Sequence, residues 1–287
     1  MSPFGYTVLG FGGGKNQTYT AVSESIPLGA KSALFAGSYA SSMKADADPN
    51  TINKFIAVYA LTSWAGPAGG TTRDIHCVVG TLGSTAVTYA TPVSAGTVGN
   101  DWLDIKYSPH TAGKFVLVYA DTENSYYGTA VVGTVSGDSI SFATPVVFAS
   151  AMVQYVSIAM DFNTDGKFVV HYRNMNDNSY GFAIVGTISG TSLSFGTAVK
   201  YSGSSSVGVH LPAIAYDRKT ANKVLIVYQD DGNSNYGTAI VGTVSGTDIS
   251  FGTAVVFDSA ESSTISNCLT GDPFNANKFF NVYRDAS

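Results

Sequence analysis

The sequence predicts an all-β fold, a five-bladed β-propeller with four antiparallel strands in each blade. First, a Lys-Phe-x-x-x-Tyr motif recurs five times, at spacings of 60, 53, 56 and 55 residues. Second, each repeat carries the same succession of strand and turn signals. Third, the two ends of the chain hold complementary parts of one repeat, as expected of an array that closes into a ring. The five motifs begin at Lys54, Lys114, Lys167, Lys223 and Lys278, with Val224 in place of Phe in the fourth.

Four strands are predicted in each repeat. The first is short and rich in small residues, as in residues 156–160 and 212–216, and the Lys-Phe motif forms the second. An eight-residue polar loop leads to a third strand, such as residues 128–134, whose small and branched residues suit a sheet covered on both faces. A tight turn containing glycine then leads to an outer strand at residues 139–142, because glycine supplies the positive φ of a hairpin.

The last repeat is divided between the two ends of the chain. It stops at Ser287, shortly after its second strand, while residues 4–25 align without a gap on residues 127–148. We therefore expect one domain, residues 1–287, in which residues 1–25 complete the blade formed with residues 259–287. The alternatives are a two-sheet sandwich and a linear solenoid, although a solenoid would need capping repeats at both ends.

Composition excludes some partners. With a net charge of −5, the chain would repel a phosphate backbone, so nucleic acid is not expected. The sequence contains no apolar run of about 20 residues, so membrane insertion is not expected either, and the start lacks the features of a secretory signal. Cys77 and Cys268 are interpreted as two buried small hydrophobic residues, with a disulfide as the open alternative.

The loops between second and third strands are polar, and we expect them to share one face with the connections between blades. Their Asn, Asp and Ser side chains could bind sugar hydroxyls beside the aromatic rings of Tyr127, Tyr180 and Tyr236. Alternatively, the Asn and Asp side chains cap turns and the tyrosines pack between blades. The candidate ligand-binding residues of these loops are Asp121, Asn124, Ser125, Asn174, Asn178, Asp230, Asn233 and Ser234.

Two tryptophans depart from the repeat and are further candidates. Trp64 lies in a loop seven residues longer than its counterparts, where it could stack on a ligand, plug the channel or cover a neighbouring blade. Trp102 precedes Asp104 and Lys106 on an innermost strand whose counterparts carry small residues. An ion pair lining the channel, or a pair of groups facing a ligand, would explain the last two. Unequal sites are therefore expected around a nearly symmetric scaffold.

The opposite face carries a recurrent acidic residue six positions before the motif lysine, interpreted as a turn cap. Asp161 begins a segment with a faint similarity to a calcium loop, but the remaining ligands are missing, so no metal site is expected. Glycoside hydrolases need two carboxylates in one pocket, whereas Asp104 is the one carboxylate recognised on an innermost strand. We therefore expect no catalysis and no cofactor. The recurrent residues are Asp48, Asp161, Asp217 and Asp272.

Units such as residues 236–257 resemble repeats of tail-fibre-like and other virion-surface proteins of tailed bacteriophages, notably aquatic ones, as does the glycine-rich opening at residues 7–14. The five-bladed architecture is similar to that of tachylectin-type lectins. These resemblances imply a non-enzymatic binding protein on the virion surface, outside the cell, with a glycan or host-surface receptor as partner. The alternatives are a structural decoration or adaptor protein that binds other virion proteins, and a five-bladed glycoside hydrolase.

Overall fold

The computed structural model describes residues 40–62, 73–83, 86–202, 208–259 and 268–283. The predictions for residues 1–25, for Trp64 and for the junction between Ser287 and Met1 lie outside these residues. The described chain is all-β, and every strand pairing in it is antiparallel. Two short 3-10 turns interrupt it, η2 (Thr122–Asn124) and η3 (Asp231–Asn233). In this part of the chain no helix has the length and hydropathy to cross a membrane.

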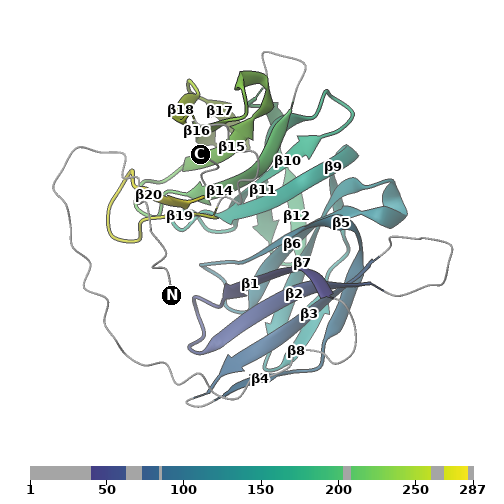
Figure 1. Cartoon of the computed structure of the whole chain (residues 1–287). Coiled ribbons are helices and arrows are strands. Elements are labelled where there is room, and N and C mark those ends of the chain that lie inside the picture. Colours follow the sequence, from purple (N-terminus) through teal and green to yellow (C-terminus); the bar gives the residue numbers. More distant parts are fainter. Residues whose placement is uncertain (1–39, 63–72, 84–85, 203–207, 260–267, 284–287) are drawn as a thin grey trace, which may run out of the picture.

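The strands follow one another in similar units, each built from an inner strand, a motif strand, a third strand and an outer strand (Figure 1). The first unit contains β1 (Ala40–Ala47), β2 (Lys54–Thr62), β3 (Arg73–Leu82) and β4 (Val87–Tyr89). The second contains the end of β5 (Val93–Tyr107), β6 (Lys114–Asp121), β7 (Tyr127–Ser136) and β8 (Ser139–Phe142). The third contains the end of β9 (Val146–Met160), β10 (Lys167–Asn174), β11 (Tyr180–Ser189), β12 (Ser192–Phe195) and β13 (Val199–Lys200).

The fourth unit contains β14 (Val209–Tyr216), β15 (Lys223–Asp230), β16 (Tyr236–Ser245), β17 (Asp248–Phe251) and β18 (Val255–Asp258). Two further strands, β19 (Cys268–Gly271) and β20 (Phe279–Val282), pair with each other and lie beside β14. All five copies of the Lys-Phe motif thus contribute a second strand, as the sequence predicts.

The outer strand is divided, which the sequence analysis did not foresee. β8 pairs with the second half of β7, while the first half of β7 pairs with the beginning of β9. The third and fourth units divide the outer strand in the same way, with β12 and β13 on β11 and with β17 and β18 on β16. β9 then crosses to the next unit and pairs with β10 as its inner strand. Because β5 crosses in the same way, backbone hydrogen bonds join the first three units into one 13-stranded sheet.

Hydrophobic side chains fill the spaces between successive units. On β6, Phe115 and Leu117 pack into the core shared with the first unit, whereas Val116 and Val118 pack into the core shared with the third. Two further core clusters lie between the third and fourth units and between the fourth unit and β19–β20. This period of two, with both faces buried, explains why the motif strands are almost continuously apolar.

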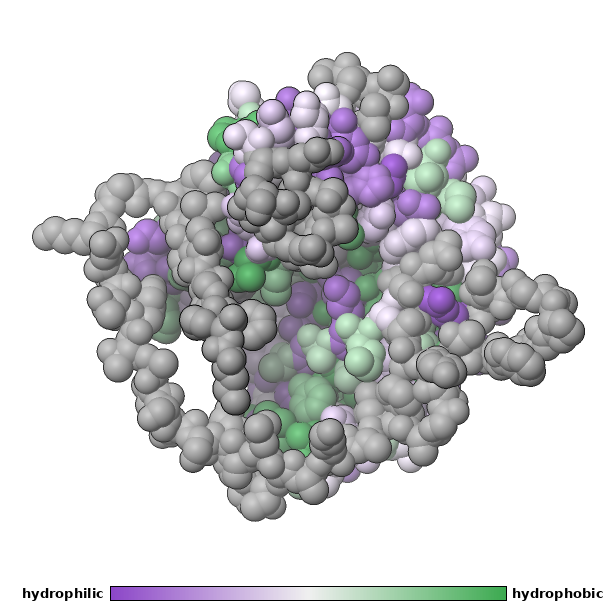
Figure 2. Space-filling model, in the orientation of Figure 1, coloured by the Kyte–Doolittle hydropathy of each residue, from purple (hydrophilic) through white to green (hydrophobic). Residues whose placement is uncertain are grey.

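The inner strands lie side by side in chain order, because β1 contacts β5, β5 contacts β9, β9 contacts β14 and β14 contacts β19. The sheets therefore extend outward from a common centre, and Figure 2 shows the hollow between them. This arrangement of antiparallel sheets fits a β-propeller. It also places one end of every inner strand near the polar loops and the other end near the short turns that contain the recurrent aspartates.

Candidate functional site

A cavity of about 170 Å³ lies among the inner strands. Each of these strands contributes the residue that pairs with the third residue of the Lys-Phe motif, so the five contributing residues occupy equivalent positions. Small side chains occupy three of the five positions and leave room, while charged side chains occupy the other two. We call these residues the inner ring: Asp46, Lys106, Ala159, Ala215 and Thr270.

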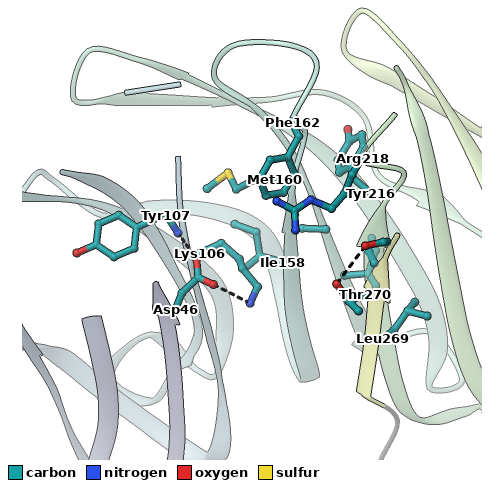
Figure 3. A pocket seen from close by; sticks show the side chains of 14 residues that line it. Asp46, Lys106, Tyr107, Ile158, Met160, Phe162, Tyr216, Arg218, Leu269 and Thr270 are labelled. Carbon is teal, nitrogen blue, oxygen red and sulfur yellow. Dashed lines mark hydrogen bonds and ion pairs between the residues drawn. The ribbon is translucent and has the colours of Figure 1, made fainter. Parts of the chain in front are cut away.

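The charged members of the inner ring form an ion pair between two units (Figure 3). Lys106 Nζ lies 3.5 Å from Asp46 Oδ1, and the Tyr107 N–H donates to Asp46 Oδ2 at 2.7 Å. Burial raises the pKa of Asp46, and Lys106 offsets this only in part. Burial alone would lower the pKa of Lys106, but Asp104 and Asp46 together outweigh it and raise that pKa. The lysine therefore stays protonated.

A second cation lines the same cavity. The guanidinium of Arg218 lies 4.0 Å from the centre of the Phe162 ring, a cation–π contact between the turns that follow β9 and β14. Figure 3 shows the ends of Arg218 and Lys106 pointing into the cavity from different walls. In the described part of the chain, the structure shows no carboxylate paired with Arg218.

The structure changes the interpretation of Asp104. Its two oxygens accept hydrogen bonds from the backbone N–H groups of Ile105 (2.9 Å) and Ile158 (3.1 Å), so Asp104 ties β5 to β9. Lys106 pairs instead with Asp46, which the sequence analysis missed. A signal was present, since Asp46 precedes the recurrent Asp48 by two residues, as Lys106 precedes Ser108.

On the loop face, three of the predicted residues cap turns. Asp121 accepts a hydrogen bond from the Glu123 N–H at 3.1 Å, and Asp230 accepts one from the Gly232 N–H at 3.1 Å. In the third unit Asn174 Oδ1 accepts a hydrogen bond from the Asn176 N–H at 2.9 Å. Burial raises the pKa values of both aspartates, and the neighbouring acidic residue in each loop adds to the effect. These three side chains therefore shape the loops.

The remaining loop candidates are exposed: Asn124, Ser125, Asn178, Asn233 and Ser234. Three of them adopt a left-handed backbone, with φ of 55° at Ser125, 47° at Asn178 and 54° at Ser234. A residue in this conformation lets the backbone turn sharply, and Asn adopts it more readily than most residues. Their side chains remain available to a ligand.

Trp102 belongs to a group of aromatic and charged side chains that converge from three units. Its ring lies 5.9 Å from that of Tyr155, which lies 5.5 Å from the ring of His210. The guanidinium of Arg173 is 5.7 Å from the centre of the Tyr155 ring, and Asp231 Oδ2 lies 3.0 Å from His210 Nε2. All five side chains are partly exposed, and we call them the Trp102 cluster.

Bulges in the inner strands determine the direction in which side chains of the Trp102 cluster point. The register of β9 against β10 shifts between His171 and Arg173, where Tyr155 has a φ of 49°. A similar shift follows His210 in β14. An extra residue in one strand turns its side chain away from the regular alternation. Sequence patterns therefore could not show that Tyr155 and His210 join Trp102.

His210 cannot satisfy all of its neighbours at once. Arg173 Nη1 and Asp231 Oδ2 both lie 3.0 Å from His210 Nε2, but the first can only donate a hydrogen bond and the second can only accept one. A neutral imidazole nitrogen does one or the other, so one of the two charged groups keeps bonding capacity. Arg173 Nε is buried without a hydrogen-bond partner among the described residues, so the guanidinium can reach a ligand only through its other nitrogens. The cluster can thus offer a ligand both stacking surfaces and a charged group.

The recurrent aspartates on the opposite face do cap turns. Asp161 Oδ1 accepts from the Asn163 N–H at 2.8 Å, and Asp272 Oδ1 accepts from the Phe274 N–H at 2.7 Å. The cysteine prediction was wrong in part. Both thiols are free and Cys77 is buried, but Cys268 is exposed at the start of β19.

Comparisons with known proteins found a structural similarity but no match in sequence. No family model and no curated protein matches the chain. The structure is similar to that of the subtype N11 neuraminidase-like protein of an H18N11 virus from a flat-faced bat, with 8% sequence identity and a TM-score of 0.44. The match covers 92% of this chain and 87% of that protein. A similarity this low carries no argument about the fold, the ligand or the activity of this chain.

Proposed function

We propose that this chain is a non-enzymatic, five-bladed binding propeller of a phage virion surface that recognises a glycan through its loop face. The observation that carries the proposal is the Trp102 cluster, in which aromatic rings from the second and third units lie beside charged groups of the third and fourth. Aromatic rings stack on the apolar faces of sugars, and the charged groups bind their hydroxyls. The exposed loop residues Asn124, Asn178 and Asn233 would extend the contact surface.

The carboxylates of the centre favour binding over catalysis. Hydrolysis of a glycoside requires two carboxylic groups that face the same pocket. Of the described residues that line the central cavity, only Asp46 carries a carboxylate, and it is paired with Lys106. The nearby Asp104 has both oxygens engaged by backbone N–H groups.

An array of bacterial polysaccharides tests the proposal. We expect saturable binding to a subset of the glycans, weakened roughly threefold to tenfold by Trp102→Ala or Tyr155→Ala, because each removes one aromatic contact. Trp102→Phe should retain most of the affinity. The matched control is Phe274→Ala, which removes an exposed aromatic ring from a turn on the opposite face.

Each outcome of the array separates the alternatives. No binding to any glycan would contradict the proposal, as would glycan binding that Trp102→Ala and Tyr155→Ala leave unchanged. Glycans shortened during incubation would instead indicate a hydrolase. Specific co-purification with capsid or tail subunits, without glycan binding, would support the structural decoration or adaptor protein.

A further inference from the structure

We propose that the central cavity is a separate binding site for a small organic acid with a single carboxylate group. This site does not depend on the proposed function, because it lies at the other end of the inner strands from the Trp102 cluster. On β5, Trp102 and Lys106 are four residues apart, a distance of roughly 13 Å along an extended strand. The two sites can therefore be tested independently.

The size of the cavity limits the ligand. Its volume of about 170 Å³ is well below the roughly 300 Å³ at which pockets for drug-sized ligands begin. The small side chains of Ala159, Ala215 and Thr270 create this space, although two other members of the same ring are large and charged. The repeat itself does not require the five positions of the inner ring to differ in size and charge.

The charges of the lining determine which ligand fits. Lys106 and Arg218 supply two positive charges, and the carboxylates of Asp46 and Asp104 both act on Lys106, so Arg218 is the cation that they leave uncompensated. Lys106 is already paired with Asp46, whereas the guanidinium of Arg218 contacts an aromatic ring. Arg218 is thus the group that can form a new bond, and a guanidinium binds a carboxylate through two parallel hydrogen bonds.

The rest of the wall accommodates the body of the ligand. Ile158, Met160, Ile214 and Leu269 offer apolar contacts, and Thr270 brings a hydroxyl group. A compact molecule with a carboxylate at one end satisfies both parts of the lining. A second carboxylate on the ligand would find no unpaired cation, because Lys106 is already paired with Asp46, and a cationic ligand would be repelled by Arg218.

Titration calorimetry with three probes tests the site: glucuronate, butyrate and neutral glucose. Saturable binding of at least one of the acids, tighter than that of glucose, is expected. Arg218→Met should weaken it by about tenfold, the effect of one lost charge-assisted interaction. The matched control is Lys219→Gln, which removes the neighbouring positive charge outside the cavity and should change the affinity less than about twofold.

A second, cavity-filling variant tests the site in case Arg218→Met fails to fold. Ala215→Val keeps every charge but occupies space in the cavity, so it should also weaken binding of the acid while leaving the circular dichroism spectrum unchanged. Trp102→Ala should leave the affinity for the acid intact. The proposal is overturned if neither acid binds, if glucose binds as tightly as glucuronate, or if Arg218→Met and Ala215→Val both retain full affinity.

Discussion

His171 and Tyr201 form a buried hydrogen-bonded pair, with 2.7 Å between the Tyr201 hydroxyl oxygen and His171 Nδ1. The equivalent positions of the neighbouring units carry Val118 with Phe148, and Val227 with Phe257, so the polar pair replaces an apolar one. Burial lowers the pKa of His171 to about 3. The sequence shows the substitution, but the contact between residues 30 positions apart is evident only in the folded chain.

This pair predicts a dependence of stability on pH. In the unfolded chain His171 binds a proton below about pH 6.5, whereas in the folded chain it stays neutral down to about pH 3. Since protons then favour the unfolded state, its contribution should make the free energy of unfolding fall as the pH drops through this range, by up to about 1.4 kcal/mol per unit.

Urea denaturation between pH 7 and pH 5 measures the effect. The double variant His171→Val with Tyr201→Phe restores the residues of the neighbouring units, so it should fold and show a smaller loss of stability on acidification. An equally steep loss in the double variant would contradict the assignment to His171.

At the scale of elements, the third strands show why their glycines recur. The ring of Phe115 on β6 covers Gly133 on β7, and a Cβ atom there would overlap the ring. The same pairing joins Phe55 to Gly80 and Phe168 to Gly186. The Lys-Phe motif and the third-strand glycine therefore form one structural unit, although about 20 residues separate them.

We expect Gly133→Ala to destabilise the protein by about 1–3 kcal/mol, because the added methyl group overpacks the core against Phe115. The matched control is Gly252→Ala, where the nearest atom to a new Cβ is 3.8 Å away and φ lies outside the left-handed range. This second change should be neutral or stabilise by about 0.4–1 kcal/mol, since alanine restricts the unfolded chain. Chemical denaturation distinguishes the two, and equal effects would refute the explanation.

Most of the secondary-structure elements could be predicted from the sequence, but the way in which some of them pair could not. Motif strands, third strands and capped loops were predictable because alternating burial and turn residues are local properties. The division of the outer strand was not, because β8 and the beginning of β9 share one partner, β7. For the loops, the residue types did not distinguish the caps Asp121, Asn174 and Asp230 from their exposed neighbours.

At the scale of the whole molecule, shared strands and cores hold the units together. β5 and β9 each belong to two units, and short turns add bonds such as that from the Asn163 side-chain amide to the Asp217 carbonyl, at 3.2 Å. If residues 1–25 complete the sheet of β19 and β20, as the sequence predicts, the position of the chain ends is not essential to the fold.

A circular permutant tests the closed ring. Joining Ser287 to Met1 through a short flexible linker and opening the exposed turn between Gly190 and Thr191 should give a folded protein. Its Tm should lie within about 5 °C of that of the natural order, which for a chain of 287 residues is a change of about 3 kcal/mol. Removal of residues 1–25 should instead abolish cooperative unfolding. A permutant that fails to fold, beside a truncated chain that folds normally, would exclude the predicted ring.

The sequence by itself determined the repeat, the strands, the turns and the all-β class, because strand alternation and turn chemistry depend on residues close together in the chain. Only the tertiary structure decided which side chains of different units meet. Asp46 reaches Lys106, and His210 reaches Arg173, because sheets packed around a common centre bring the strands of neighbouring units together. Bulges then aim side chains such as Tyr155 out of the regular alternation, and the pattern of residues along one strand does not encode their direction.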